Sequence, residues 1–251
     1  MSILTIDDDL YVLNELGNPI KLTLRNWTNL LEDWSRMERQ WVVIINRIIV
    51  SLNRQVKTPS MYGIKECAQG GDCMFGCIAE AFNSVLEKDK YTIQDIRNEA
   101  MKNISSDNFE ILKNEYITAK ESDEISWDPS ELKTYQDLQK LISEPGTIWG
   151  DYSILDLLRQ SMNFNVIIFR DEQIYNKEER VTLRDKYRLY NTMFDFDRNY
   201  PTIFLYYIED VHFQLIGCFF TDTKEIKVLF DYNEIPEEIK VLYKQDIGKE
   251  L

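Results

Sequence analysis

The sequence predicts an α+β fold, or a mixed α/β sandwich, from three observations. Segments with apolar residues at helical spacing dominate the chain up to about residue 163. Segments rich in β-branched and aromatic residues are concentrated after residue 164, and two of them are close enough in sequence to form a hairpin. Helices first and strands late, without strict alternation, are typical of α+β proteins.

The chain is long enough to bury a sizeable core. Its 251 residues, 44% of them hydrophobic, fit one large domain or a domain with an appendage. We divide it into residues 1–60, a hairpin and a long helix expected to pack on the core, and residues 61–251, the main domain.

The first segment predicts a hairpin followed by one long helix. Leu10–Leu13 and Ile20–Leu24 flank a turn that contains Gly17, Asn18 and Pro19. The residues from about 26 to 53 then carry an apolar stripe at helical spacing. The stripe consists of Trp27, Leu30, Leu31, Trp34, Met37, Trp41, Ile45, Ile48 and Leu52. Pro59 ends this region, and we expect a linker from there to residue 69.

The middle of the chain predicts a series of helices, each with apolar residues on one face. They are Cys73 to about Val85, Thr92 to Ile104, Asn108 to Lys120, Tyr135 to Ser143, and a helix with Ile154, Leu157, Leu158 and Met162 on one face.

The strand-like segments come last. They are Asn165–Phe169, Thr202–Tyr207, His212–Phe219 and Glu225–Phe230. The stretch from 171 to 199 is charged, rich in tyrosine and poorly periodic, so we expect a long irregular excursion there. A final helix from Pro236 to about Tyr243 is expected to cover the sheet.

Charge and cysteine content limit the possible partners. Lysine and arginine number 29 against 43 acidic residues, a net charge of −14, which disfavours nucleic-acid binding and suits a basic partner or solubility alone. The N-terminus lacks the features of a signal peptide, and the apolar stretch Trp41–Leu52 is too short to span a membrane. The four cysteines form no dense disulfide pattern, so we expect a cytoplasmic protein without a membrane partner.

Cys73 is the first candidate functional residue. It follows Gly70, Gly71 and Asp72 at the start of a predicted helix. Free N–H groups and the helix dipole at such a position stabilise a thiolate, which predicts a lowered pKa and a nucleophilic thiol. A small buried hydrophobe is the alternative for any single cysteine. The spacing of Cys67, Cys73 and Cys77 lacks the paired Cys-x-x-Cys of zinc sites, so we expect no metal and no other cofactor.

His212 is the only histidine and the candidate base. It begins an alternating strand on which Gln214 shares its face, so the Gln214 amide is expected to orient the imidazole. Nucleophile, base and orienting group are the components of thiol catalysis. The separation of 139 residues between Cys73 and His212 allows them to meet on folding.

Three blocks, in order, resemble the ovarian-tumour (OTU) family of deubiquitinating cysteine proteases. Gly70–Phe75 is similar to the family's Asp-Gly-x-Cys-[Leu/Met]-Phe motif. Trp149–Asp151, with the helix and strand after it, resembles the Trp-Gly block. Val211–Ile216 is similar to the His-aromatic-[Asn/Asp]-x-[Val/Ile] strand. The Gly-Gly-Asp-Cys form resembles divergent OTU-like proteins of large DNA viruses, which implies a viral protein in the host cytoplasm or the virion.

The resemblance implies a fold, an activity and a set of site residues. The fold would be papain-type, with a small, mostly antiparallel sheet between helical layers. The activity would be cleavage after the C-terminal glycine of ubiquitin, polyubiquitin chains or a ubiquitin-like modifier. Cys73 would be the nucleophile and His212 the base and then acid. Gln214 would be the third member, Gly70, Gly71 and Asp72 the oxyanion loop, and Trp149 a neighbour of the substrate channel.

Two departures from the family pattern leave alternatives open. Gly70 stands where the family usually has Asp, which predicts a looser oxyanion loop, and Gln214 stands where it has Asn or Asp. Asp151 or Glu209 could orient His212 instead. A catalytically degraded ubiquitin-binding or scaffold protein, and a cysteine protease for another polypeptide, are therefore the alternative functions.

Overall fold

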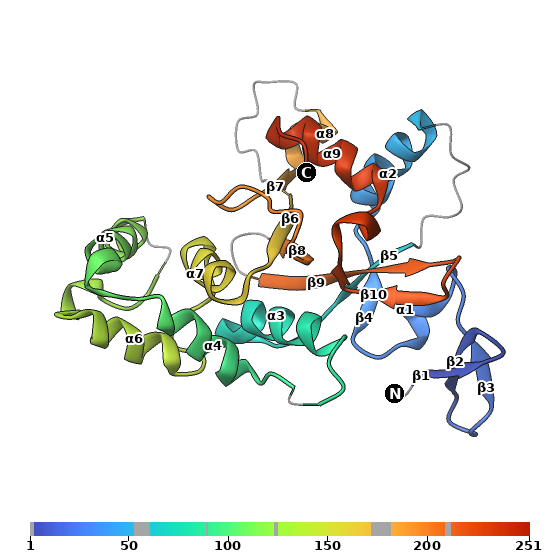
Figure 1. Cartoon of the computed structure of the whole chain (residues 1–251), viewed down its shortest axis with the longest axis horizontal. Coiled ribbons are helices and arrows are strands. Elements are labelled where there is room, and N and C mark those ends of the chain that lie inside the picture. The colour runs from blue at the N-terminus through green and yellow to red at the C-terminus, as the bar shows by residue number, and fades with distance from the viewer. Residues whose placement is uncertain (1–2, 53–60, 89, 123–124, 172–181, 209–211) are drawn as a thin grey trace.

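A mixed eight-stranded sheet forms the centre of the protein (Figure 1). The computed structural model describes residues 3–52, 61–88, 90–122, 125–171, 182–208 and 212–251. The strand order is β4-β5-β9-β8-β6-β7, with β10 beside β9 and β11 beside β8. These strands are β4 (Trp34–Arg36), β5 (Tyr62–Lys65), β6 (Asn165–Asp171), β7 (Tyr187–Tyr190), β8 (Thr202–Ile208), β9 (His212–Phe220), β10 (Glu225–Lys227) and β11 (Leu229–Phe230).

The sheet is mostly antiparallel, with β6 and β8 as the parallel pair among the described strands. Alternate side chains point to opposite faces, so each face has its own core. On β6, Val166 and Ile168 pack in one apolar cluster while Ile167 and Phe169 pack in the other. The predicted α+β class, with a central sheet between helical layers, is confirmed.

Helices cover both faces of the sheet (Figure 1). Residues of α3, α4, α5, α6 and α7 form the larger cluster, and residues of α2 and α9 form the cluster on the opposite face. The bounds are α2 (Arg39–Ser51), α3 (Cys73–Asn83), α4 (Ile93–Lys102), α5 (Ser106–Glu121), α6 (Tyr135–Ser143), α7 (Tyr152–Met162) and α9 (Glu237–Ile247). The predicted helices in these regions are confirmed, and Thr92 and Thr134 close capping boxes at the starts of α4 and α6.

The N-terminal residues form a separate three-stranded sheet of β1 (Ile3–Ile6), β2 (Asp9–Leu13) and β3 (Pro19–Lys21). The β2–β3 pair is the predicted hairpin, and β1 is an addition to it. A small core of Val12, Leu22 and Trp27 joins this region to Phe219 of β9. The domain boundary expected at residue 60 lies at the end of 53–60, outside the described residues.

The single long helix predicted from 26 to 53 is wrong. The segment forms α1 (Trp27–Leu30), then β4, then α2. Asp33 adopts a left-handed φ of 65°, which no continuous helix permits. Glu38 then caps α2, because its carboxylate accepts from the N–H groups of Gln40 and Trp41.

Two expected irregular regions contain regular structure. The expected linker before residue 69 contains β5, which pairs with β9 in the middle of the sheet. The expected excursion from 171 to 199 contains α8 (Leu183–Lys186) and β7, while its residues 172–181 lie outside the described residues. The predicted strand 225–230 is divided into β10 and β11, which pair with different neighbours. None of the helices in the described part of the chain has the length and apolar character needed to cross a membrane.

Candidate active site

Cys73 is the first residue of α3, directly after a 3-10 turn formed by Gly70, Gly71 and Asp72. Gly70 has a φ of +62°, a left-handed conformation that favours glycine. The predicted position of the thiol at a helix start is therefore confirmed. Because Met74, Cys77 and Ile78 of this helix are buried in the core, the start of α3 is firmly held.

The thiol is buried rather than exposed. Cys73 is 2% exposed, and its Sγ accepts a hydrogen bond from the backbone N–H of Phe213 at 3.4 Å. Burial raises the pKa of the Cys73 thiol above its ordinary value, and the N–H groups of Phe213, Met74 and Cys73 only partly oppose this. The predicted lowering of the pKa is wrong because desolvation of the thiolate outweighs the donors at the helix start.

His212 lies at the start of β9, next to the residue whose N–H binds the Cys73 sulfur. Its Nε2 is hydrogen-bonded to the carboxylate of Glu66. Its Nδ1 has no hydrogen-bond partner among the described residues, and no hydrogen bond joins the imidazole to the thiol. A base held at Nε2 by a carboxylate keeps Nδ1 available to receive a proton.

Glu66 is the site residue that the sequence did not reveal. The side chain of Gln214, expected to orient His212, instead donates from Nε2 to Glu66 Oε2 at 2.6 Å. Gln214 therefore supports the carboxylate, and its role as direct partner of the imidazole is corrected. The Glu66–His212 pair is partly shielded from solvent, with the Glu66 side chain 37% exposed and that of His212 23% exposed.

The sheet register explains this arrangement. β5 and β9 are antiparallel with Lys65 opposite Leu215, which brings Glu66, the next residue, opposite Gln214. Cross-strand neighbours and their diagonal partners lie within reach of long side chains, so Glu66 also meets His212 two residues along. The backbone N–H of Glu66 donates to Asp33 O at 2.9 Å, which fixes the end of β5.

The residues expected to form an oxyanion loop directly precede Cys73 in the chain. We call Gly70, Gly71 and Asp72 the oxyanion loop. The N–H of Cys73 donates to Gly70 O within this 3-10 turn. The N–H groups of Gly70 and Gly71 precede the first bond of the turn and form no hydrogen bond with a described residue. The loop therefore presents free backbone donors.

Trp149 lies beside this loop and is 49% exposed. A Cβ placed on Gly71 would lie 2.9 Å from Trp149 Cδ1, so the indole is in close contact with the loop backbone. The next residue, Gly150, packs still more closely on Met74 of α3, where an added Cβ would lie 2.5 Å from Met74 Cε. The expected proximity of Trp149 to the thiol loop is therefore present, and its half-exposed ring is open to a ligand.

Arg97 of α4 is a second residue that sequence reasoning missed. Its side chain is fully buried, and its Nε and Nη2 donate to Asp72 Oδ1 at 2.8 and 2.5 Å. It also donates to the carbonyl of Gly71 at 3.1 Å. On the sequence, Arg97 is one charge on an amphipathic helix, and nothing there distinguishes it from a solvated residue.

Asp151, another proposed orienting group, is not at the imidazole. Asp151 caps α7, because its Oδ1 accepts from the N–H of Ile154 at 2.8 Å, so its role as a partner of His212 is corrected. Burial raises the pKa of Asp151 to about 6. Glu209 lies outside the described residues.

All four cysteines are free thiols. Within the described ranges, no group of three or more histidine, cysteine or acidic side chains is arranged to hold a metal ion. The thiol, the imidazole and the carboxylate of Glu66 are together the components of nucleophilic catalysis.

Comparisons with known proteins give distant structural likenesses only. No family profile and no curated protein matches the sequence. The OTU domain of OTUD1 is similar at 13% identity and a TM-score of 0.43, over 70% of this chain and 93% of that one. An OTU deubiquitinase from Wolbachia pipientis wMel bound to ubiquitin has 12% identity and a TM-score of 0.41, over 69% and 98%. The viral OTU domain protease from Taggert virus has 11% and 0.33, over 62% and 86%. At TM-scores this low the likeness assigns no function, so the chemistry rests on the residues of this chain.

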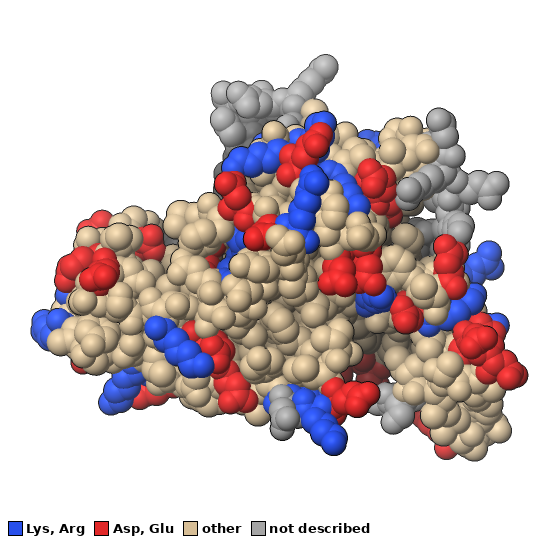
Figure 2. All heavy atoms as spheres, viewed as in Figure 1, with Lys and Arg blue, Asp and Glu red and all other residues tan. Residues whose placement is uncertain are grey.

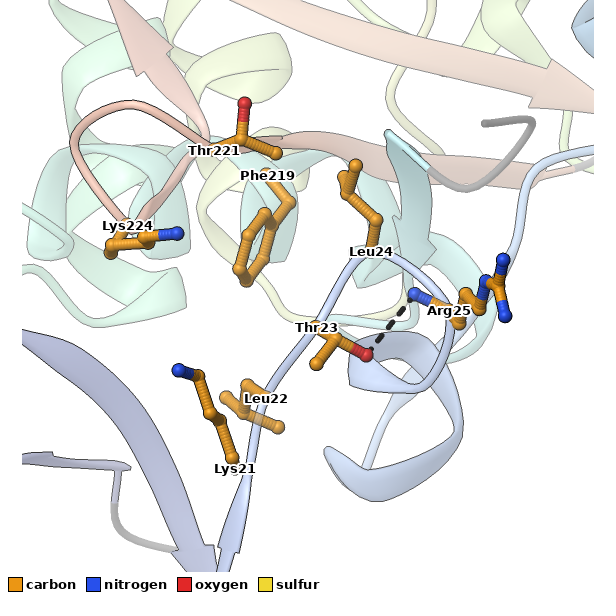
Figure 3. A pocket seen from close by; sticks show the side chains of 8 residues that line it. All are labelled: Lys21, Leu22, Thr23, Leu24, Arg25, Phe219, Thr221 and Lys224. Carbon is orange, nitrogen blue, oxygen red and sulfur yellow. Dashed lines mark hydrogen bonds between the residues drawn. The ribbon is translucent and has the colours of Figure 1, made fainter. Parts of the chain in front are cut away.

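A hollow of about 440 Å³ lies far from the thiol (Figure 3). Its walls come from the end of β3 and the segment after it, and from the end of β9 and the turn that follows, and they include Lys21, Leu24, Phe219 and Lys224. Phe219 is seven residues from His212 along an extended strand, roughly 24 Å at the usual rise per residue. The hollow contains none of the candidate catalytic residues and is separate from that site.

The negative charge is not gathered into one area on the face in view. Figure 2 shows acidic and basic side chains interspersed in separate groups on this face, with uncharged areas between them. Among the described residues, several acidic side chains form ion pairs, for example Asp246 with Arg184 and Asp195 with Lys249. The net charge of −14 therefore acts as a diffuse field rather than as one acidic patch on this face.

Proposed function

We propose that this chain is a cysteine deubiquitinase. It would hydrolyse the isopeptide or peptide bond after the C-terminal glycine of ubiquitin or a ubiquitin-like modifier. The observation that carries the proposal is the Glu66–His212 pair, which lies one residue from the backbone donor to the Cys73 sulfur. The resemblance of three sequence blocks to OTU proteases supports the choice of substrate.

The reaction proceeds by acyl transfer. His212 Nδ1 takes the thiol proton as Cys73 Sγ attacks the glycine carbonyl carbon, and the carbonyl oxygen becomes an oxyanion. The C–N bond then breaks, the protonated imidazole gives its proton to the departing lysine amine, and a thioester remains. Water, deprotonated by His212, attacks the thioester carbonyl carbon, and the C–S bond breaks. The imidazolium returns its proton to the sulfur, which restores the thiol, and the carboxylic acid formed loses its proton to solvent.

Glu66 makes His212 an effective base. Its carboxylate accepts a hydrogen bond from Nε2–H, which leaves the lone pair of the neutral ring at Nδ1, and it stabilises the imidazolium that forms during attack. Gln214 holds the second carboxylate oxygen and so limits rotation of Glu66. This is the function that we assign to both residues in place of a direct Gln214–His212 bond.

The raised pKa of Cys73 favours a neutral thiol as the resting nucleophile. A preformed thiolate–imidazolium pair would lower the thiol pKa, whereas burial here raises it. Proton transfer to His212 therefore accompanies substrate binding and attack. In the free protein the two groups are not hydrogen-bonded, and catalytic hydrogen bonds often tighten only in the substrate complex.

The free N–H groups of Gly70 and Gly71 are the proposed oxyanion donors. Each well-aimed donor contributes on the order of 3 kcal/mol of transition-state stabilisation. The half-exposed Trp149 ring beside Gly71 would cover the channel that admits the glycine tail. An overall acidic protein suits a basic substrate tail, and the proposed setting is the cytoplasm.

Turnover of a panel of diubiquitin linkages tests this proposal. We expect the wild-type protein to cleave at least one linkage and Cys73→Ala to cleave none while remaining folded. A short peptide whose Gly-Gly sequence is joined to a lysine side chain by an isopeptide bond serves as the comparison substrate. Cleavage of unrelated peptides at rates equal to those of diubiquitin would instead favour a cysteine protease for another polypeptide.

A second candidate function is ubiquitin binding without catalysis. The buried thiol with a raised pKa, and the lack of a Cys73–His212 hydrogen bond, favour it. Binding of diubiquitin with no turnover of any linkage by the wild-type protein would select this candidate. Ubiquitin binding by Cys73→Ala alone does not distinguish the two.

A further inference from the structure

We propose that Arg97 is the positioning residue that holds the oxyanion loop in its active conformation. This inference rests on the proposed function and extends it. The loop has glycine at position 70, where an aspartate is usual in the resembled family, and therefore needs another support. Asp72 and the buried guanidinium of Arg97 provide that support from a neighbouring helix.

Arg97 binds the loop at two points. Its Nε and Nη2 both donate to Asp72 Oδ1, and Nη2 also donates to Gly71 O at 3.1 Å. Because the peptide group is planar, fixing the Gly71 carbonyl and the Asp72 side chain restricts rotation of the backbone directly before Cys73. The free N–H groups of Gly71 and Gly70 are one and two peptide units upstream of this carbonyl, so their directions are restricted as well.

The same guanidinium ties the loop to the segment that carries Trp149. Nη1 donates to Ile142 O at 2.8 Å and Nη2 to Ile148 O at 3.1 Å. The N–H of Gly146 donates to Asp72 Oδ1 at 3.3 Å, so Asp72 also binds the segment that carries Trp149. Arg97 thus fixes both the proposed oxyanion donors and the loop that positions the Trp149 ring.

Because the position is buried, only arginine can make this set of hydrogen bonds. Arg97 is 0% exposed, so a donor that lost its partner would remain buried and unpaired. The planar guanidinium matches several acceptors at fixed angles, which an ammonium group cannot reproduce. Its plane also covers the ring of Phe75 in α3, 4.1 Å from ring centre to guanidinium carbon.

Arg97→Lys tests the inference, with Asp72→Asn as the second variant. Arg159→Lys is the matched control, because Arg159 is also buried and donates to the carbonyls of Phe164 and Phe194, away from the loop. The measurements are kcat and KM on diubiquitin, alkylation of Cys73 by iodoacetamide located by peptide mass spectrometry, and amide hydrogen exchange of the peptide spanning residues 69–75.

We expect Arg97→Lys to lower kcat by about tenfold or more, because oxyanion donors act mainly on the transition state. KM and the alkylation rate of Cys73 should change by less than about threefold, because alkylation by iodoacetamide forms no oxyanion. Exchange in residues 69–75 should become faster in Arg97→Lys and in Asp72→Asn. It should remain at the wild-type rate in Arg159→Lys.

Two results would overturn the inference. One is an unchanged exchange rate of residues 69–75 in both loop variants, which tests the positioning role even if the wild-type protein cleaves nothing. The other is a fall in kcat that Arg159→Lys reproduces at equal loss of thermal stability. Failure of the proposed function is a different outcome, namely a wild-type protein whose Cys73 is alkylated but which cleaves no ubiquitin substrate.

Discussion

The carboxylate of Glu66 binds Nε2 of His212, a residue 146 positions later in the chain. The two residues meet because β5 and β9 are neighbours in the sheet. The same carboxylate accepts from Gln214, so one acidic side chain connects the imidazole to the next residue on its face. This relationship assigns the third member of the site to a residue that precedes the cysteine loop.

Glu66→Ala should therefore lower kcat more than Gln214→Ala does. Loss of Glu66 removes the partner that fixes the tautomer and stabilises the imidazolium, so we expect kcat to fall by about 100-fold or more. Gln214 acts through Glu66, so Gln214→Ala should lower kcat much less. Steady-state turnover of diubiquitin measures both, and a larger loss in Gln214→Ala would reverse the assignment.

The alkylation rate of Cys73 should continue to increase up to an unusually high pH. Because burial raises its pKa, the free protein holds less thiolate at neutral pH than an exposed cysteine does. The iodoacetamide alkylation rate of Cys73 should therefore still be increasing at a pH where that of a model thiol has levelled off. The label must be located by mass spectrometry, since Cys67 is partly exposed. A plateau at lower pH than that of the model thiol would indicate a preformed thiolate.

The sequence predicted the local parts of the site and missed the non-local ones. Cys73 and His212 could be located because a glycine-rich turn before a helix and an alternating strand are local patterns. Glu66 could not, because its role depends on the register of β5 with β9, and the segment before the loop resembled a linker. Its only signal was the short strand pattern of Tyr62–Lys65.

The prediction of one long helix from 26 to 53 was wrong for a related reason. Apolar spacing through residues 26–53 fits a helix, but the turn at Asp33 and the pairing of β4 with β5 depend on tertiary contacts. Trp27 and Trp34, which the pattern assigned to one helical stripe, instead pack on each other with ring centres 4.9 Å apart. Arg97 was missed because its acceptors lie in three other segments of the chain.

Asp151→Asn should stabilise the protein at neutral pH. The folded pKa of Asp151 is about 6 against an ordinary 3.8, so as pH rises through this window the unfolded chain loses its proton first and folding stability falls. Asparagine removes the buried charge and remains a good helix cap for α7. Thermal unfolding should show a higher Tm than wild type at pH 8 and little difference at pH 4. An equal shift at both values would contradict this account.

A methyl group at Gly71 should disturb Trp149. The added Cβ would meet Trp149 Cδ1 at 2.9 Å, whereas a Cβ at Gly70 meets no atom within 4 Å and is opposed only by its left-handed φ. We expect Gly71→Ala to raise KM and the double variant with Trp149→Ala to be no worse than either single variant. Additive effects in this double-mutant cycle would show that Gly71 and Trp149 do not act through each other.

Removal of residues 1–59 should yield an insoluble protein. The segment supplies β4 to the central sheet and buries Trp41, Ile44 and Ile45 of α2 in the core shared with α9. Its loss would expose a large apolar face. Soluble expression is the first readout, and a soluble truncated enzyme with altered linkage preference would indicate a substrate-site role instead.

The most direct test of the central claim is covalent capture by ubiquitin that carries a C-terminal electrophile. We predict a single adduct of the wild-type protein that maps to Cys73 by peptide mass spectrometry. It should be absent in Cys73→Ala and slower in Glu66→Ala. No adduct with a folded wild-type protein, or an adduct located at Cys67, would contradict the assignment of Cys73, His212 and Glu66 as the catalytic residues.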